Sequence, residues 1–257
     1  MNPLNAVWML LPLLLVASPS ALDSQNPPLE HRSKVVDRSI EFHGGGIYDN
    51  SVVQLEICSK SGCYQIESRI DEGLFDISAV GRVRDHERRV RITNDTLEYW
   101  QDSVLQDVTP ERDRSLRDWV MARAYFVFLP YRLRDDSVRH EDLGFEHWDG
   151  KPLRKVKVTF VPGSSSGADD EFLYWFDPET ARLEMFAYSF AGNPGGLRLR
   201  RAVDHRRVGG ILFFDQENWG VDGDGLSVDT IDPVTAGGWK LVSRVTLQDI
   251  RVQPFGS

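Results

Sequence analysis

Cysteine is scarce in this chain, which has two among 257 residues, Cys58 and Cys63. With no other thiol in the sequence, they cannot build a four-sulfur zinc site. They flank the residues Ser59 to Gly62, and the stretches on either side alternate apolar and polar side chains. A hairpin with a four-residue loop would place the two sulfurs opposite each other, and a glycine can supply the positive φ of the turn. We predict a Cys58–Cys63 disulfide, with free thiols or a redox pair as the alternatives.

The chain also lacks an excess of positive charge. It has 30 Lys and Arg against 39 Asp and Glu, which gives a formal net charge of -9. Proteins that bind nucleic acids need a basic face to neutralise phosphates. The composition therefore predicts no nucleic-acid partner.

No apolar run reaches the roughly 20 residues that a membrane-spanning helix needs. The run over residues 6–17 instead has the length of the hydrophobic region of a secretory signal peptide, followed by small residues at 18–21. No Lys or Arg precedes it. We predict a signal peptide over residues 1–21 and a single β-rich domain over residues 22–257. The protein is then periplasmic or secreted rather than an integral membrane protein, and an uncleaved N-terminal anchor is the alternative.

Catalytic and metal-binding motifs are missing as well. Gly163 to Gly167 spells the nucleophile elbow G-x-S-x-G, but a strand follows it, and the elbow requires a strand-to-helix turn. Asp222 to Gly225 resembles the start of a calcium loop, yet Leu226 stands where the third ligand is needed. An irregular site that adds Asp229 and Asp232 is the alternative to a plain turn. The six histidines show no paired metal spacing. We predict no enzyme activity, no catalytic residues, no metal and no cofactor.

Several strands in the second half of the chain are apolar on both faces. They are Phe172–Phe176, Leu183–Phe190 and Ile211–Phe214. A half-buried antiparallel strand alternates apolar and polar side chains, so a strand with two apolar faces must be covered on both sides. Helices, a lid or a bound apolar ligand could supply the second cover.

Two helices are predicted, one over Ser33–Phe42 before three glycines and one that begins at Thr109 and ends near Leu129, because Pro130 bars its continuation. The predicted strands are Val52–Cys58, Cys63–Ser68, Gly73–Val80, Arg88–Thr93, Thr96–Gln101, Lys155–Phe160, Glu171–Phe176, Leu183–Phe190, Leu197–His205, Gly209–Gln216 and Trp239–Val252. Strands resume from Phe145, and Asp149-Gly150 is a hairpin signal. Short connections rich in Gly, Pro and Asp favour antiparallel neighbours. We predict an α+β fold with a strongly curved antiparallel sheet of about ten strands and two or three covering helices.

The polar residues that most resemble a binding site are Arg198, Arg200 and Arg206, with Asp215 and Asn218 on the next strand. Alternation along a strand sends Arg198 and Arg200 to the same face. If that face is concave, the arginines would bind an anionic head group through charge-assisted hydrogen bonds. If it is convex, they are solvated surface charges.

Taken together, several segments resemble an uncharacterised family of exported bacterial proteins. They are Tyr125–Leu133 with Leu143-Gly144, Lys155–Phe160, Phe172–Asp177, Ala187–Phe190, Gly195–Arg200, and Arg206–Phe214 with Asp215 and Asn218. The chain departs from the family pattern at Leu199, Arg201 and Trp219. That family is similar, more distantly, to the LolA/LolB/LppX lipoprotein-carrier superfamily, which shares a strand, a turn like Asp177-Pro178-Glu179-Thr180, and a returning strand. The resemblance implies an antiparallel half-barrel that holds acyl chains, without enzyme activity.

We therefore predict a periplasmic, non-enzymatic carrier that holds a lipid or hydrophobic small molecule in the concave face of a β half-barrel. The predicted apolar lining is Trp119, Phe126, Phe128, Tyr131, Phe160, Tyr174, Phe176, Phe186, Tyr188 and Phe213. The predicted polar contacts are Arg198, Arg200, Arg206 and Asp215. The alternative is an interaction module for another envelope protein, with a filled core and no ligand.

Overall fold

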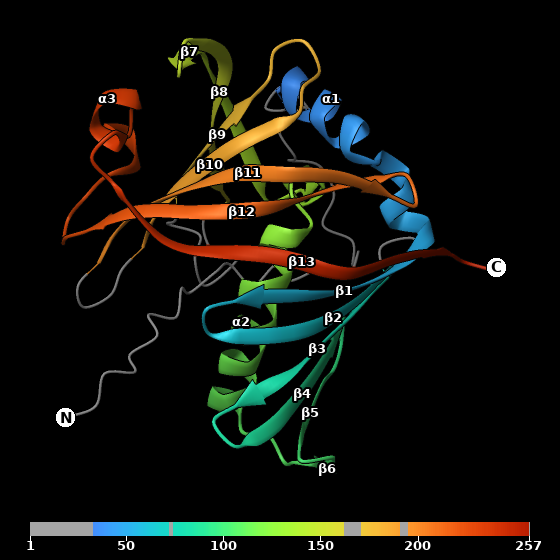
Figure 1. Ribbon diagram of the computed structural model, residues 1–257. Coiled ribbons are helices and arrows are strands. Elements are labelled where there is room, and N and C mark those ends of the chain that lie inside the picture. The colour runs from blue at the N-terminus through green and yellow to red at the C-terminus, as the bar shows by residue number, and fades with distance from the viewer. Residues whose placement is uncertain (1–32, 72–73, 162–170, 191–194, 257) are drawn as a thin grey trace.

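The computed structural model describes residues 33–71, 74–161, 171–190 and 195–256. The predicted signal peptide and the serine-rich loop Gly163–Gly167 lie outside these residues. The described strands form one antiparallel sheet in the order β6-β5-β4-β3-β2-β1-β13-β12-β11-β10-β9-β8-β7. Because β6 and β7 end this order without pairing to each other, the sheet is open, and it curves around α2 (Figure 1). The predicted half-barrel fold is confirmed.

The strands are β1 (Ser51–Ser59), β2 (Gly62–Asp71), β3 (Leu74–Val83), β4 (His86–Thr93), β5 (Leu97–Gln101), β6 (Val104–Leu105), β7 (Val138–Trp148), β8 (Lys151–Phe160), β9 (Phe172–Phe176), β10 (Leu183–Phe190), β11 (Gly196–Val208), β12 (Ile211–Asp222) and β13 (Lys240–Pro254). The helices are α1 (Lys34–His43), α2 (Pro110–Val127) and α3 (Pro233–Ala236). The described residues also form three short 3-10 helices, η2 (Gly45–Asn50), η3 (Tyr131–Arg134) and η4 (Val228–Thr230). The connection between β12 and β13 contains η4 and α3.

The predicted strand number of about ten is wrong, because the described sheet has 13 strands. Absent from the prediction are β6, which is one edge, and the part of the other edge strand, β7, that precedes Phe145. Most residues of β7 are partly or fully exposed, and Phe145 exposes 60% of its surface. An edge strand that is exposed to solvent on both faces does not alternate apolar and polar residues, so its sequence resembles that of a loop.

The two longer helices begin and end close to the predicted residues. Thr109 caps α2 by accepting a hydrogen bond from the Arg112 amide, and Pro110 is the first helical residue. At the end of α1, Gly44 has a φ of 134°, which glycine tolerates, and its amide donates to the carbonyls of Ile40 and Glu41. None of the described helices is long and apolar enough to cross a membrane.

The two faces of the central strands belong to two separate hydrophobic clusters. Along β9, Phe172, Tyr174 and Phe176 join the larger cluster, which contains α1 and α2. Leu173 and Trp175 join the smaller cluster on the opposite side. We call the side of the sheet that carries α1 and α2 the inner face, and the opposite side the outer face.

The outer face is covered by the chain's own connection between β12 and β13. Val228 and Ile231, from η4 and the residue that follows it, are buried against Trp175, and Trp239 packs at the margin. Lys157 holds this connection through an ion pair with Asp229 (3.0 Å). The strands that are apolar on both faces must be covered on both sides. On the outer face, other parts of the chain provide this cover, and no ligand is needed there.

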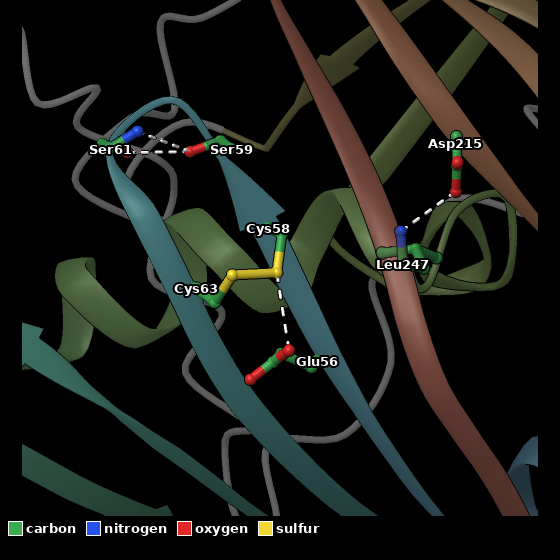
Figure 2. The surroundings of a disulfide bond; sticks show 7 residues. All are labelled: Glu56, Cys58, Ser59, Ser61, Cys63, Asp215 and Leu247. Atoms are coloured by element: carbon green, nitrogen blue, oxygen red, sulfur yellow. Dashed lines mark hydrogen bonds between the residues drawn. A yellow bond between two sulfur atoms is a disulfide. The ribbon is translucent and has the colours of Figure 1, made fainter.

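The Cys58–Cys63 disulfide is confirmed, and Figure 2 shows it joining β1 and β2. The two cysteines are direct partners in the register, and Ser59 pairs with Gly62. The turn therefore has two residues rather than the predicted four. Gly62 adopts the expected positive φ, at 114°.

Replacing both cysteines with serine is expected to lower the free energy of unfolding by about 2 kcal/mol. The cross-link closes a loop of only a few residues, so the entropy that it removes from the unfolded chain is small. Urea unfolding of the oxidised protein and the double variant measures the difference. Reductant should shift the wild-type midpoint to that of the variant and leave the variant unchanged; an identical midpoint for all samples would contradict a stabilising disulfide.

Candidate ligand-binding face

All ten aromatic residues predicted to line a ligand are buried together in the larger hydrophobic cluster. None exposes more than 4% of its surface. Four come from α2 and the turn after it, namely Trp119, Phe126, Phe128 and Tyr131, and the other six from β8, β9, β10 and β12, namely Phe160, Tyr174, Phe176, Phe186, Tyr188 and Phe213. The tertiary structure thus brings all ten to one region, and their contact with a ligand stays a prediction.

The end of α2 lies against the inner face of β10. The Phe126 ring stacks on Phe186, with ring centroids 5.2 Å apart, and on Tyr188 at 5.5 Å. Tyr174 of β9 stacks on Phe186 at 5.7 Å. Alternate residues of a strand point to the same face, so these rings form a continuous surface. We call the five inner-face rings of β9 and β10 the aromatic wall: Phe172, Tyr174, Phe176, Phe186 and Tyr188.

Two tyrosine hydroxyls lie within this aromatic surface. Tyr174 and Tyr125 expose 0% and 1% of their surfaces, and the two phenols interact with each other. In the described part of the chain, neither hydroxyl has a hydrogen bond of ordinary geometry. Burial raises the pKa of Tyr125 to about 12 and that of Tyr174 well above its ordinary value. Both are therefore neutral at physiological pH, and each can donate to or accept from a polar atom beside it.

Among the cation–ring contacts of the described residues, the one that reaches a ring of the aromatic wall is that of Arg200, which lies 5.7 Å from the Tyr188 ring centroid. Its guanidinium carbon lies 4.6 Å from the centroid of the Phe126 ring. Its Nε donates to the Tyr188 hydroxyl (3.1 Å) and its Nη1 to Oε1 of Gln216 (3.0 Å). Since Phe126 and Tyr188 are both buried in the larger cluster, these contacts place the charge on the inner face.

The other three predicted polar residues are already paired. Arg198 forms an ion pair with Asp222 (2.8 Å) and lies over the Phe190 ring. Arg206 and Asp215 pair with each other at 2.8 Å. Asp215 also accepts a hydrogen bond from the Leu247 amide on β13, which Figure 2 shows. These charges are balanced by protein groups before any ligand is considered.

One buried polar residue of β12, Gln216, was missed from the sequence. Gln216 exposes 1% of its surface, and Asn218, which the sequence analysis did name, exposes 8%. The two alternate along a strand that begins with Ile211-Leu212-Phe213-Phe214, so a polar side chain two residues before Asn218 was the available signal. Gln216 donates from Nε2 to the Phe126 carbonyl (3.0 Å), which links β12 to the end of α2.

A second group of arginines and aromatic rings fastens α2 to β2 and β5. The Arg123 guanidinium lies 4.1 Å from the Tyr64 ring centroid and 4.3 Å from that of Trp119. Arg112 lies 4.8 Å from the ring of Tyr99. Burial lowers the pKa of Arg123. Trp119 and Arg123 are four residues apart on one helix face, which is the sequence signal for such a pair.

His43 is buried and both of its ring nitrogens are used. The Leu183 amide donates to Nε2 (3.2 Å), so Nδ1 carries the proton and donates to the Leu212 carbonyl (3.2 Å). Burial lowers the pKa of His43 to about 3. A neutral imidazole fixed by two main-chain groups joins α1 to β10 and β12 and is not placed to act as a general base.

The one metal-like cluster in the described ranges consists of Glu56, Cys58 and Cys63. Both sulfurs belong to the disulfide, so they offer no thiolate to an ion. The expected absence of a metal site is consistent with this chemistry but is not tested by it.

Residues 101–232 match a family of unknown function (DUF6503), which is slightly more than half of the chain. The chain belongs to this family. The family segment runs from the last residue of β5 to the residue before α3. It therefore contains α2, the aromatic wall, Arg200 and most of the outer-face cover. No curated protein matches the chain.

Solved structures with a similar fold include a LolA superfamily protein and two other proteins of bacterial origin. A LolA superfamily protein from Nitrosomonas europaea has a TM-score of 0.49 and 12% identity, covering 84% of this chain and 91% of its own. A domain assigned as an outer membrane lipoprotein-sorting protein from Vibrio parahaemolyticus has a TM-score of 0.41 and 10% identity, covering 86% and 93%. The lipoprotein LppX of Mycobacterium tuberculosis has a TM-score of 0.30 and 14% identity, covering 64% and 90%. Likeness at this level transfers no function to the DUF6503 chain.

Proposed function

We propose that this protein is a non-enzymatic carrier that holds a lipid or other apolar ligand between the inner face of its sheet and the covering helices. The observation that carries this proposal is the pair of hydroxyls of Tyr125 and Tyr174, which are buried inside the aromatic surface and meet each other there. A hydroxyl can donate one hydrogen bond and accept two, so this contact leaves part of the hydrogen-bonding capacity of both groups unused. Two such groups side by side favour a face that receives a guest with a polar atom over a core closed for stability alone.

Export to the periplasm or the cell exterior belongs to the same proposal, with cleavage after residue 20 or 21 and one domain over residues 22–257. The disulfide between Cys58 and Cys63 supports it, because such bonds persist in oxidising compartments. A carrier outside the cytoplasm would meet lipids and hydrophobic small molecules from the envelope.

Protein purified without detergent is expected to carry a bound hydrophobic molecule. Native mass spectrometry should show a mass above that of the chain, which disappears after extraction with organic solvent. A fluorescent fatty acid should then bind to the extracted and refolded protein and be displaced by the extract. If only the mass of the chain is detected and the fluorescent fatty acid does not bind, the carrier proposal is wrong.

The alternative is an interaction module with a filled core, and the exposed apolar residues on the edge strands favour it. Val104 and Leu105 of β6 each expose 61% of their surfaces, and Phe145 of β7 exposes 60%. Edge strands offer unpaired main-chain groups to a partner strand. This function predicts ligand-free protein and a partner from envelope extract whose binding is lost when Val104 and Leu105 are both replaced by lysine.

A further inference from the structure

Arg200, like Arg207, has no anionic partner among the described residues, whereas the other three arginines of β11 do. Arg198 pairs with Asp222, Arg201 with Asp149, and Arg206 with Asp215. No carboxylate of a described residue lies within ion-pair distance of Arg200; both of its printed hydrogen-bond partners, Tyr188 and Gln216, are neutral. It is nevertheless the arginine of β11 that lies against the buried aromatic rings.

Arg200 is partly buried, and its described partners are all neutral. They are the Tyr188 hydroxyl, the Gln216 amide oxygen and the face of the Phe126 ring, and a cation–ring contact contributes only about 0.5–2 kcal/mol. An anionic group of a ligand would form a stronger, charge-assisted hydrogen bond to this guanidinium than these neutral partners do.

The geometry also leaves part of the guanidinium available. Nε and Nη1 are engaged by Tyr188 and Gln216, whereas Nη2 has no hydrogen bond to any residue within the described ranges. Gln216 itself donates to the Phe126 carbonyl, so the guanidinium of Arg200 is held in one orientation before a ligand binds. A fixed guanidinium with free N–H groups suits a carboxylate or phosphate oxygen.

We infer that Arg200 binds the anionic end of an acyl chain whose hydrocarbon part lies along the aromatic wall. The ligand class is an anionic amphiphile, either a fatty acid or a lipid with a phosphate end group. The inference rests on the proposed carrier function and narrows its ligand from any apolar molecule to one with an acid group. It also selects Arg200 from the four polar residues that the sequence offered.

The test compares ligands of one chain length with different ends. Palmitate, hexadecanol and palmitoyl lysophosphatidate are titrated against the full protein by displacement of a fluorescent probe. The wild-type protein is expected to bind at least one of the two anions about tenfold or more tightly than hexadecanol, because a hydrogen bond to a charged group is worth more than one to a neutral group. Whichever of palmitate and lysophosphatidate binds more tightly shows whether the acid group is a carboxylate or a phosphate.

Arg200→Gln should remove this preference and leave the affinity for hexadecanol unchanged, whereas Arg200→Lys should retain part of it. The matched control is Arg201→Gln on the same strand, whose ion pair with Asp149 lies away from the aromatic wall and whose loss should alter no affinity. Equal binding of the three ligands by wild-type protein, or an equal loss of all three in Arg200→Gln, would overturn the inference. Binding of none of them would instead overturn the carrier function itself.

A second variant keeps the test decisive if Arg200→Gln does not fold. Gln216→Glu places a carboxylate where the amide oxygen lies 3.0 Å from Nη1, and so gives Arg200 a counter-ion of its own. The same change removes the Nε2 donor to the Phe126 carbonyl, and hexadecanol binding measures the effect of that loss. Relative to hexadecanol, palmitate and lysophosphatidate binding should weaken about tenfold. Unchanged anion binding in Gln216→Glu would contradict a head-group role for Arg200.

Discussion

Trp175→Ala is expected to lower the free energy of unfolding by about 4 kcal/mol, the usual cost of deleting a large buried ring. Trp175 has no exposed surface and belongs to the outer-face cluster. Its ring lies 5.4 Å from that of Trp148, and its Nε1 donates to Glu146 (2.7 Å). The substitution leaves a cavity beneath η4 and removes one of the donors that hold the Glu146 carboxylate. Equilibrium urea unfolding, monitored by circular dichroism, measures the loss.

The matched control is the same substitution at Trp100. That residue lies on β5 with part of its surface exposed, and its ring contacts Arg89 at 5.2 Å. Its loss should cost about 1 kcal/mol or less. Equal costs for the two variants would mean that the outer face is not a second core. Because Trp175 faces away from the aromatic wall, folded Trp175→Ala should keep the ligand preference of the wild-type protein.

The stability of the protein is expected to fall by about 2 kcal/mol between pH 7.5 and pH 5 through His43 alone. In the folded protein, burial holds the pKa of this imidazole at about 3, against about 6.5 in the unfolded chain. Below pH 6.5 the unfolded state binds a proton that the folded state excludes. The contribution of His43 is therefore complete above about pH 6.5 and decreases as the pH falls towards 3.

Comparison with His43→Gln isolates this contribution. Glutamine can donate to the Leu212 carbonyl and accept from the Leu183 amide but does not titrate, so its stability should change less over the same pH range. Burial also lowers the pKa of His205, so some acid sensitivity remains in the variant. Urea unfolding at pH 7.5, 6.5, 5.5 and 5 gives both curves. Parallel curves would show that His43 is not the group responsible.

Much of the fold could be read from local chemistry. The ends of α1 and α2 follow from the capping residue Thr109 and from the glycines after His43, which act within one helical turn. The disulfide follows from the hairpin register, because residues opposite each other in a two-stranded turn are close in any fold. The edge strand β6 and the first part of β7, before Phe145, could not be found in the same way, since solvent on both sides removes the apolar alternation that marks a strand.

The candidate site was only partly within reach of the sequence. The ten aromatic residues were recognisable because each sits in an apolar strand or helix end. The difference between Arg200 and Arg198 was not recognisable, because both are arginines with the same alternation on β11. It depends on Asp222 at the end of β12 and on Phe126 at the end of α2, which only the folded chain brings to them.

By itself the sequence determined that the central strands are apolar on both faces, because the spacing of side chains along a strand is fixed by the backbone. Only the tertiary structure decided what covers each face. The connection through η4 and α3 closes the outer face, and α1 and α2 lie on the inner one. Such contacts join residues far apart in the chain, and burial depends on those distant partners rather than on neighbours in sequence.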